Sequence, residues 1–335
     1  MKYHNVDLHN VRDIILEDGQ PGFTISRLPL AIHPDINEGA RRMSFLSGGA
    51  EIRGMLPENG RAVVTLQALD ENVVPPVVTV FLGSSRFRQC VLPREPMEII
   101  IEEPANMPLM SAIHDRTPQP FGPRLVRICL PHIHKIRIVS IAGDLTYPEP
   151  TALPARTLLC YGSSITHGAH AIVPETTYVS QCGYHLGYDV INLGLGGSAH
   201  MDAAVADHIA SRDDWDLATL EMGVNVRTWD PERFRAAVDR FVTTIVSAHP
   251  DKLVFCIDLF PNNYDFMDEP PGAIGFREIV KDVAARQNSA KVIHVDGRSL
   301  QTRPSGLQVD LVHPNEHGMI EIGRNLATLI SGYVR

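Results

Sequence analysis

Five short, unbroken apolar runs recur between residues 158 and 295, and they constrain the fold of this chain more than any other feature. Longer stretches with helical periodicity separate them, which is the pattern of a parallel sheet covered by helices on both faces. The runs are Leu158–Tyr161, Val190–Leu193, Leu217–Met222, Leu253–Leu259 and Val292–Val295. Residues 151–335 are therefore predicted to form a three-layer α/β/α domain, with any site at the carboxyl ends of the strands.

Residues 22–141 show a different pattern, in which short segments rich in β-branched residues alternate with Gly or Pro at spacings typical of a sandwich. The predicted strands are Phe23–Leu28, Glu51–Met55, Ala62–Leu66, Val77–Leu82, Phe87–Leu92, Glu98–Glu102, Leu125–Leu130 and Lys135–Ile141. Of the 25 prolines, 17 lie in residues 1–156, as expected where turns and sheet edges are frequent. Residues 1–150 are predicted to be an antiparallel, jelly-roll-like β-sandwich domain.

Composition excludes several classes of protein. The net charge is −9 and no run of Lys and Arg forms a basic stripe, so a nucleic-acid partner is not expected. The most apolar window is short and broken by Pro75 and Pro76, so no membrane span is predicted. The first residues lack the apolar stretch of a signal peptide. Five cysteines without a C-x-x-C spacing argue against a disulfide framework and a zinc site, and favour a cytoplasmic location.

Four polar segments lie at strand ends of the predicted α/β domain. They are Gly162–Thr166, Asn192–Gly197, Gly223–Asn225 and Asp310–Pro314. In this order the segments resemble the four blocks of the GDSL or SGNH hydrolase superfamily, and the resemblance covers residues 157–331. It implies a flavodoxin-like domain and an enzyme that acts on esters.

Carried over by position, the resemblance implies a catalytic triad and an oxyanion hole. The nucleophile is Ser164, with His313 as its base and Asp310 as the group that orients the base. These residue types suit the roles, because a serine hydroxyl needs a base and a carboxylate can hold the imidazole in the correct tautomer. The oxyanion-hole donors are the backbone N–H groups of Ser164 and Gly197 and the side-chain amide of Asn225.

Two positions depart from the family pattern. Ser163 stands where the first block usually has Asp, and Val226 stands where Asp usually follows the third-block Asn. The first departure leaves two candidate nucleophiles, Ser163 and Ser164, and Ser164 is preferred because Ile165-Thr166 keeps the register of the block. Taken alone, this Gly-Ser-Ser segment also fits a helix N-cap.

Other patterns in the sequence could indicate a nucleotide site or a metal site. Gly194–Ala199 fits the G-x-G-x-x-[GA] form of a dinucleotide fingerprint, with Glu221 as a ribose-binding acid, but it leaves the Ser164 and Asp310–His313 segments unexplained. His132 and His134 could be two metal ligands, although surface histidines are favoured. We therefore expect neither a metal nor another cofactor. His167 and His170 fit either the mouth of the pocket or a solvated helix face.

The expected function is ester hydrolysis through an acyl-serine intermediate, on an acylated carbohydrate or another small ester. Acyl transfer to a hydroxyl of a sugar or natural product is the alternative, because the same four blocks serve both reactions. A carbohydrate-binding sandwich is less favoured, since only 6% of the chain is aromatic. The expected partner is a small-molecule ester, with neither nucleic acid nor a membrane, and homo-oligomerisation is left open.

Overall fold

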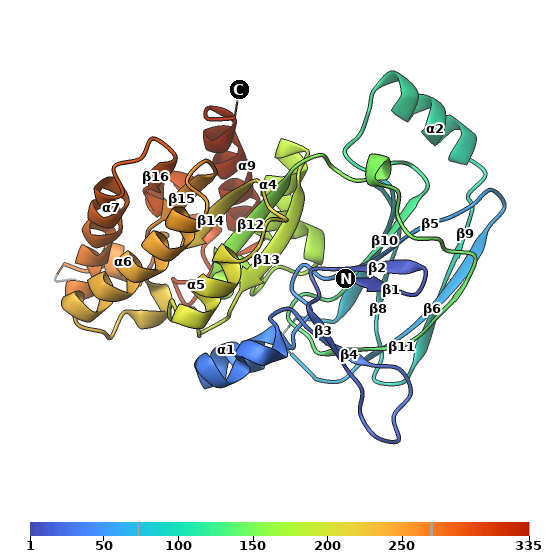
Figure 1. Cartoon of the computed structure of the whole chain (residues 1–335), viewed down its shortest axis with the longest axis horizontal. Helices are drawn as coiled ribbons and strands as arrows, with labels where there is room; N and C mark the ends of the chain where they lie inside the picture. Colours follow the sequence, from blue (N-terminus) through green and yellow to red (C-terminus); the bar gives the residue numbers. More distant parts are fainter. Residues whose placement is uncertain (73, 269–270, 335) are drawn as a thin grey trace.

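The computed structural model describes residues 1–72, 74–268 and 271–334. Figure 1 shows two regions side by side, with antiparallel strands on one side and a layered α/β arrangement on the other. The C-terminus follows the last helix of the α/β region. The strands of the antiparallel sheets come from residues 2–143, and the parallel strands come from residues 157–295.

A five-stranded parallel sheet forms the centre of the α/β region. Its strands are β12 (Thr157–Gly162), β13 (Asp189–Gly194), β14 (Leu217–Glu221), β15 (Leu253–Ile257) and β16 (Val292–Val295). The strand order is β13-β12-β14-β15-β16, which is the flavodoxin-like order. The five apolar runs are therefore confirmed as parallel strands, and the chain reverses its direction of winding between β12 and β14.

Helices cover both faces of this sheet. Successive residues of β12 face opposite sides: Leu158 packs with Tyr178 of α4, and Leu159 packs in a second cluster with Phe241 of α6. One face carries α4 (Tyr178–Leu186) and α9 (Glu316–Ser331), and the other carries α5 (Ala203–Ala210), α6 (Pro231–Ala248) and α7 (Phe276–Arg286). Shorter helices are α3 (Ser164–His167) and α8 (Gly297–Leu300). The predicted three-layer fold is confirmed.

The antiparallel region consists of two main sheets. One has the order β1-β2-β5-β10-β7-β8 and the other β11-β6-β9. Their strands are β1 (Lys2–Tyr3), β2 (Val6–His9), β5 (Glu51–Met55), β6 (Arg61–Ala68), β7 (Val77–Leu82), β8 (Ser85–Val91), β9 (Met97–Glu102), β10 (Leu125–Cys129) and β11 (Ile136–Gly143). Buried side chains of both sheets form one apolar core. The predicted sandwich is confirmed.

Several elements of the antiparallel region were not predicted. The expected strand Phe23–Leu28 is reduced to β4 (Thr24–Ser26), which pairs with β3 (Asp13–Ile15) outside the two main sheets. Two helices, α1 (Glu38–Ser44) and α2 (Met107–Arg116), also interrupt the series of strands. Short 3-10 helices lie in the connections of both regions, at Leu30–Asp35, Pro150–Ala152, Pro174–Thr176, Val224–Val226, Asn263–Phe266, Gly272–Gly275 and Pro304–Gly306.

Hydrogen bonds join the antiparallel region to the α/β region. Arg53 of β5 makes a bidentate ion pair with Asp189 of β13, at 2.6 and 2.8 Å, and Arg53 is buried. The His9 ring lies 2.7 Å from the carbonyl oxygen of Val190. The division into domains at residue 150 stays a prediction, but the two regions are in close contact.

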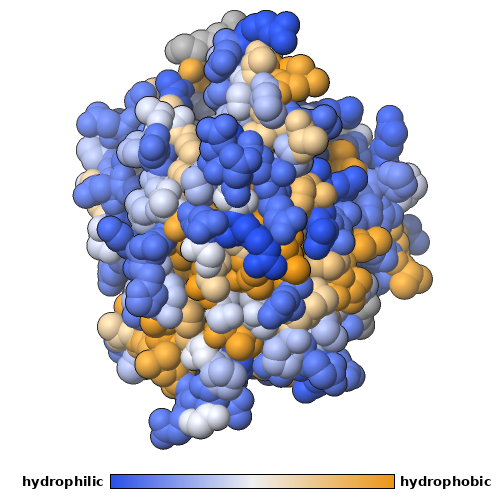
Figure 2. Space-filling model, turned by 90° about the vertical axis from the view of Figure 1, so that its right-hand side faces the viewer, coloured by the Kyte–Doolittle hydropathy of each residue, from blue (hydrophilic) through white to orange (hydrophobic). Residues whose placement is uncertain are grey.

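The outer surface of the antiparallel region carries mixed polarity. Figure 2 shows this end of the molecule, where hydrophilic residues cover much of the surface and hydrophobic residues gather in its middle and lower parts. Among the described residues, no helix combines the length and the apolar character needed to span a membrane.

Candidate active site

Ser164 lies at the carboxyl end of β12, on the first turn of the short helix α3. Ser163 is the N-cap of α3, and its hydroxyl oxygen accepts a hydrogen bond from the N–H of Ile165 at 3.1 Å. Ser163 is buried and Ser164 is half-buried. The helix N-cap interpretation of this segment therefore applies to Ser163. The nucleophile interpretation applies to Ser164, which contacts His313.

The structure brings Ser164, His313 and Asp310 together. The Oγ of Ser164 lies 2.8 Å from Nε2 of His313, and Nδ1 of His313 lies 2.7 Å from Oδ2 of Asp310. These two contacts place the imidazole between a hydroxyl and a carboxylate. A serine, a base and a group that orients the base in this arrangement can generate a nucleophile.

A compact turn holds Asp310 and His313 in place. Oδ1 of Asp310 accepts hydrogen bonds from the N–H groups of Val312 and His313, at 2.9 and 3.0 Å. Partial burial raises the pKa of Asp310, but its hydrogen bonds with the His313 ring and these N–H groups outweigh burial and lower it to about 2. The carboxylate is therefore ionised at neutral pH, as a partner for an imidazolium should be.

The loop after β13, residues 194–199, carries Gly197 beside the site. Gly197 is exposed and has φ of +69°, the left-handed region that favours glycine. A Cβ atom there would meet no protein atom within 4 Å, so backbone conformation, and not crowding by the protein, explains this glycine.

Asn225 is connected directly to the same loop. Its Oδ1 accepts a hydrogen bond from the N–H of Ala199 at 3.0 Å, so its amide nitrogen is the end that can donate to a ligand. Ser164 is the first residue of α3, where a backbone N–H has no intrahelical partner. The three predicted oxyanion-hole groups thus come from loops that follow β12, β13 and β14, which are neighbours in the sheet.

A buried arginine from the antiparallel region holds the start of the 194–199 loop. The guanidinium of Arg27 donates to the carbonyl oxygens of Asn192 and Gly194, each at 2.9 Å. It also donates to the carbonyl oxygens of Met43 and Leu46, at 2.8 and 2.7 Å. Arg27 is fully buried, and burial lowers its pKa to about 9. One side chain therefore connects the segment around α1 to the loop that carries Gly197.

A second set of contacts fixes the far end of this loop. The amide nitrogen of Asn37, the N-cap of α1, donates to the carbonyl oxygen of Ser198 at 3.0 Å and to Asp202 at 2.6 Å. Gly39 approaches Ser198 so closely that a Cβ on Gly39 would lie 2.0 Å from the Ser198 hydroxyl oxygen. No sequence pattern indicates Arg27, Asn37 or Gly39, because each contacts the loop only through the tertiary fold.

Glu221, at the end of β14, lies beneath the nucleophile segment. Its Oε2 accepts from the N–H of Ser163 at 2.6 Å and from the Thr166 hydroxyl at 3.2 Å. Its Oε1 is buried with no hydrogen-bond partner among the described residues. Burial raises the pKa of this carboxyl. A carboxyl group thus lies beside Ser163, the position where the family pattern has Asp.

The position of Glu221 also bears on the dinucleotide alternative. A ribose-binding acid must present its carboxylate to a ligand. Glu221 is buried and directed at Ser163 and Thr166, so it cannot serve that purpose here. Gly194 packs against α3, where a Cβ would lie 2.2 Å from the His167 backbone nitrogen, so this glycine serves packing between strand and helix.

Four other histidines can be compared with their predicted locations. The expectation that His132 and His134 lie at the surface is wrong, because both are buried. Nε2 of His132 lies 2.9 Å from the carbonyl oxygen of Gly168, and Nε2 of His134 lies 2.8 Å from the carbonyl oxygen of Val74. His167 is also buried. His170 does reach the site, with its ring centroid 5.0 Å from that of His313.

His170 forms a group with two members of the triad. Ligand atoms of His170, Asp310 and His313 lie within 4.8 Å of one another, close enough for one metal ion. The two nitrogens of the His313 ring already contact Ser164 and Asp310, so a metal there would compete with the serine–histidine contact. The geometry favours a proton-transfer role for His313.

Residues 160–319 match the GDSL-like Lipase/Acylhydrolase family. Among curated proteins, none matches the sequence. The structure is similar to that of a salicylyl-acyltransferase, SsfX3, from a tetracycline biosynthetic pathway. The similarity covers 99% of this chain and 96% of that chain, with a TM-score of 0.79 and 18% identity.

Two further solved structures share the fold. A putative GDSL-like lipase from Bacteroides ovatus has a TM-score of 0.71 and 20% identity, over 92% of this chain and 91% of that one. A family two carbohydrate esterase from Clostridium thermocellum has a TM-score of 0.60 and 13% identity, over 86% and 94%. Because these similarities extend over most of each chain, the combination of an antiparallel region with an α/β region is shared as well.

Proposed function

Because residues 160–319 belong to the GDSL-like lipase/acylhydrolase family, we propose that this SGNH-type enzyme cleaves a small ester through an acyl intermediate on Ser164. The observation that carries the proposal is the continuous contact from Ser164 through His313 to Asp310. An acylated carbohydrate is the proposed substrate class, supported by the carbohydrate esterases among the structures of similar fold.

In the first half of the reaction, Nε2 of His313 takes the proton of the Ser164 hydroxyl as Oγ attacks the ester carbonyl carbon. Asp310 stabilises the imidazolium that forms. The carbonyl oxygen becomes an oxyanion, which accepts hydrogen bonds from the N–H groups of Ser164 and Gly197 and from the Asn225 amide. The intermediate then collapses, and the leaving alkoxide takes the proton from His313.

In the second half, an acceptor attacks the acyl-serine while His313 takes the proton of the acceptor. The bond between the acyl group and Ser164 Oγ then breaks, and His313 returns the proton to Oγ. Water gives hydrolysis, and this is the main proposal because the acid–base pair is open to solvent: the side chains of His313 and Asp310 are 24% and 40% exposed. Acyl transfer to a sugar or natural-product hydroxyl is the second candidate. It is supported by the similarity to an acyltransferase along 99% of this chain.

The test compares Ser164→Ala with Ser163→Ala on p-nitrophenyl acetate. Loss of the nucleophile is expected to lower kcat by about 10³- to 10⁶-fold, with the residual rate coming from the oxyanion hole and binding. Ser163→Ala removes an N-cap and is expected to cost about 1 kcal/mol of stability, with a far smaller effect on kcat. Turnover that survives in Ser164→Ala and disappears in a folded Ser163→Ala would show that the nucleophile is misassigned.

The fate of the acyl group separates the two candidate reactions. The native enzyme is given p-nitrophenyl acetate with and without a soluble sugar or alcohol, and the products are identified by mass spectrometry. Hydrolysis predicts acetate as the product whether or not an acceptor is present. An acetylated acceptor as the main product would favour acyl transfer.

A further inference from the structure

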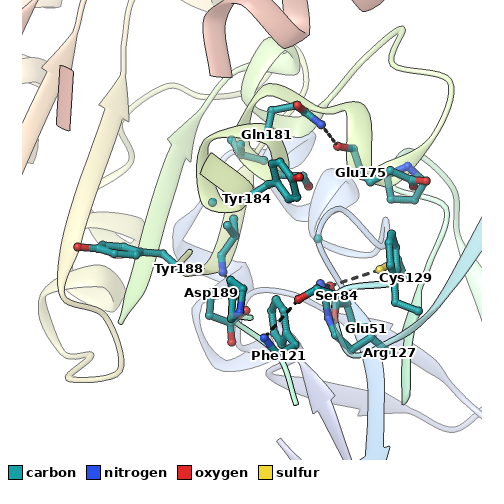
Figure 3. Close-up of a pocket in the computed structure, with 18 of the residues that line it drawn as sticks. Glu51, Ser84, Phe121, Arg127, Cys129, Glu175, Gln181, Tyr184, Tyr188 and Asp189 are labelled. Atoms are coloured by element: carbon teal, nitrogen blue, oxygen red, sulfur yellow. Dashed lines mark hydrogen bonds and ion pairs between the residues drawn. The ribbon is translucent and has the colours of Figure 1, made fainter. Parts of the chain in front are cut away.

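A cavity of about 660 Å³ lies between the antiparallel region and α4, apart from the candidate active site. Figure 3 shows it lined by side chains of both regions, including Phe121 and Arg127 on one side and Tyr184 on the other. None of the triad residues and none of the proposed oxyanion donors lines it. Its size is within the range of roughly 300–1,000 Å³ that holds small ligands in proteins.

Ion-paired side chains form part of the lining of this cavity. Glu51 accepts from Arg127 at 2.5 and 2.9 Å and from Arg53 at 2.8 Å, and Arg53 is paired with Asp189. Burial raises the pKa of Glu51, but the two guanidinium groups outweigh it and hold the pKa well below its ordinary value. Arg53 is not among the lining residues. The ionised side chains that line the cavity are Glu51, Glu175, Asp189, Arg86 and Arg127, and each of them is ion-paired.

Contacts across the boundary hold the cavity in shape. On one side, Glu175 accepts from the Thr79 hydroxyl and from the Gln89 amide, each at 2.8 Å. On the other side, the Arg53–Asp189 pair joins β5 to β13. Because these contacts fix both walls, a ligand would enter a site that already exists, which lowers the entropic cost of binding.

Aromatic side chains give the cavity apolar surfaces. Phe81 and Phe121 lie on the side of the antiparallel sheet, and the Arg127 guanidinium is 3.6 Å from the Phe121 ring centroid. Tyr184 lies on the α4 side, whereas the Tyr188 ring is directed away from the cavity and its hydroxyl accepts from Arg156. Gln119 and Gln181 are also among the lining residues. The cavity thus combines ring faces with hydrogen-bonding groups.

We propose that this cavity binds a neutral saccharide at a site separate from Ser164. A sugar ring offers a C–H face to an aromatic ring and hydroxyls to carboxylate, amide and guanidinium groups. A phosphorylated ligand is disfavoured, because three carboxylates and only two guanidinium groups line the cavity, and Arg127 is already paired with Glu51. An acyl chain is disfavoured as well, since it would cover ionised groups without offering them hydrogen bonds. The proposal does not depend on the chemistry at Ser164.

The cavity and the nucleophile segment share one helix. Tyr178, at the start of α4, contacts the Thr166 hydroxyl at 2.7 Å, whereas Val179, Gly183 and Tyr184 of the same helix line the cavity. A saccharide bound in the cavity would therefore be held next to the catalytic region without contacting its reacting groups.

The test measures binding in Ser164→Ala, so that the result is independent of the catalytic assignment. Cellobiose and xylobiose serve as probes in saturation-transfer NMR and calorimetry, at about 10 mM to detect millimolar dissociation constants. Binding of at least one disaccharide is expected. Tyr184, which is 72% exposed, can be changed to Ala with little effect on folding, and the Tyr184→Ala change should weaken binding about fivefold.

The matched control is Phe266→Ala, which removes another exposed aromatic ring, 53% exposed, outside the cavity lining. It should bind the disaccharide as the parent protein does, and thermal unfolding followed by circular dichroism confirms that both variants fold. The proposal is overturned if neither disaccharide binds at this concentration. It is overturned equally if Tyr184→Ala and Phe266→Ala bind the disaccharide as tightly as the parent.

Discussion

The two loops that build the candidate active site are held in place in different ways. The loop with Asp310 and His313 is fixed by its own short-range hydrogen bonds, which join residues two or three positions apart. The 194–199 loop is fixed at both ends by Arg27 and Asn37, which lie more than 160 positions away in the sequence. One half of the site is therefore local in sequence, and the other half depends on the antiparallel region.

This difference gives the antiparallel region a specific role. Asp310 and His313 are held by contacts within the α/β region, whereas the loop that carries Gly197 contacts the buried guanidinium of Arg27. The short helix that carries Ser164 also contacts the antiparallel region, through His132. Removing a long-range contact should therefore weaken stabilisation of the transition state while leaving the triad assembled. Substitutions in the Asp310–His313 loop and at the contacts of the 194–199 loop should therefore have different effects on kcat.

Asp310→Asn tests the local half of the site. An amide can still accept hydrogen bonds at one oxygen, but its NH₂ group facing Nδ1 would hold the imidazole in the wrong tautomer. We expect kcat to fall by about 10⁴-fold, with the protein still folded. Steady-state kinetics on p-nitrophenyl acetate measures the change, and Asp296→Asn, which alters the N-cap of α8, is the control. Activity within tenfold of the native enzyme would exclude Asp310 as the orienting group.

Asn225→Ala tests the donor that follows β14. It removes both the amide that would meet the oxyanion and the acceptor of the Ala199 N–H. Loss of one such donor lowers kcat by about 10²- to 10³-fold in well-studied hydrolases, and a similar fall is expected here. The effect should appear in kcat more than in KM, because the oxyanion exists only in the transition state. A change confined to KM would indicate that Asn225 binds the ground state.

Arg27→Lys tests the long-range half of the site. A lysine ammonium cannot reproduce the planar set of donors that reaches four carbonyl oxygens. The 194–199 loop should lose its position, and we expect kcat to fall by about tenfold or more while KM changes by less than about threefold. Asn37→Ala removes the contact with Ser198 at the other end of the loop, and we expect a smaller fall in kcat.

The control for Arg27→Lys is Arg12→Ala. Arg12 also joins the two regions, through an ion pair with Asp214 at 2.9 Å, but both side chains are partly exposed and such pairs contribute little. The Arg12→Ala substitution should leave kcat unchanged. A folded Arg27→Lys enzyme with native kcat would break the proposed dependence of the loop on the antiparallel region.

Glu221→Gln tests the buried carboxyl beneath Ser163, and its expected effect is the smallest. Burial raises the pKa of Glu221 in the folded protein, so the folded state holds this proton more tightly than the unfolded state does. Ionisation of Glu221 therefore destabilises the fold as pH rises. The difference in Tm between Glu221→Gln and the native protein should become more positive from about pH 4 to about pH 7. A constant difference would show that the carboxyl has an ordinary pKa.

Much of this architecture could be predicted because its signals are local. The strands β5, β7 and β16 have the bounds predicted from their apolar patterns. The contact between Ser164 and His313 agrees with the roles that the four sequence blocks implied. The role of Arg27 could not be predicted, because a single arginine after a short strand has no recognisable pattern until the fold places it against Gly194.

The histidine error and the reassignment of Glu221 have a similar cause. His132 and His134 looked like surface residues because histidine is usually polar and exposed, but backbone carbonyl oxygens accept their ring hydrogens in the interior. Glu221 fitted a ribose-binding pattern by its place at a strand end. Its carboxyl contacts Ser163 because β14 lies beside β12 in the sheet, and that neighbour relation is not visible in the sequence.

Covalent trapping of the nucleophile distinguishes Ser164 from Ser163 without relying on turnover. The native protein is treated with an organophosphonate that reacts with activated serines, and the labelled peptide is sequenced by mass spectrometry. We expect one adduct per chain on Ser164, no adduct in Ser164→Ala, and a retained adduct in Ser163→Ala. An adduct on Ser163, or an unlabelled enzyme that keeps its full activity, would contradict the assignment of Ser164 as the nucleophile.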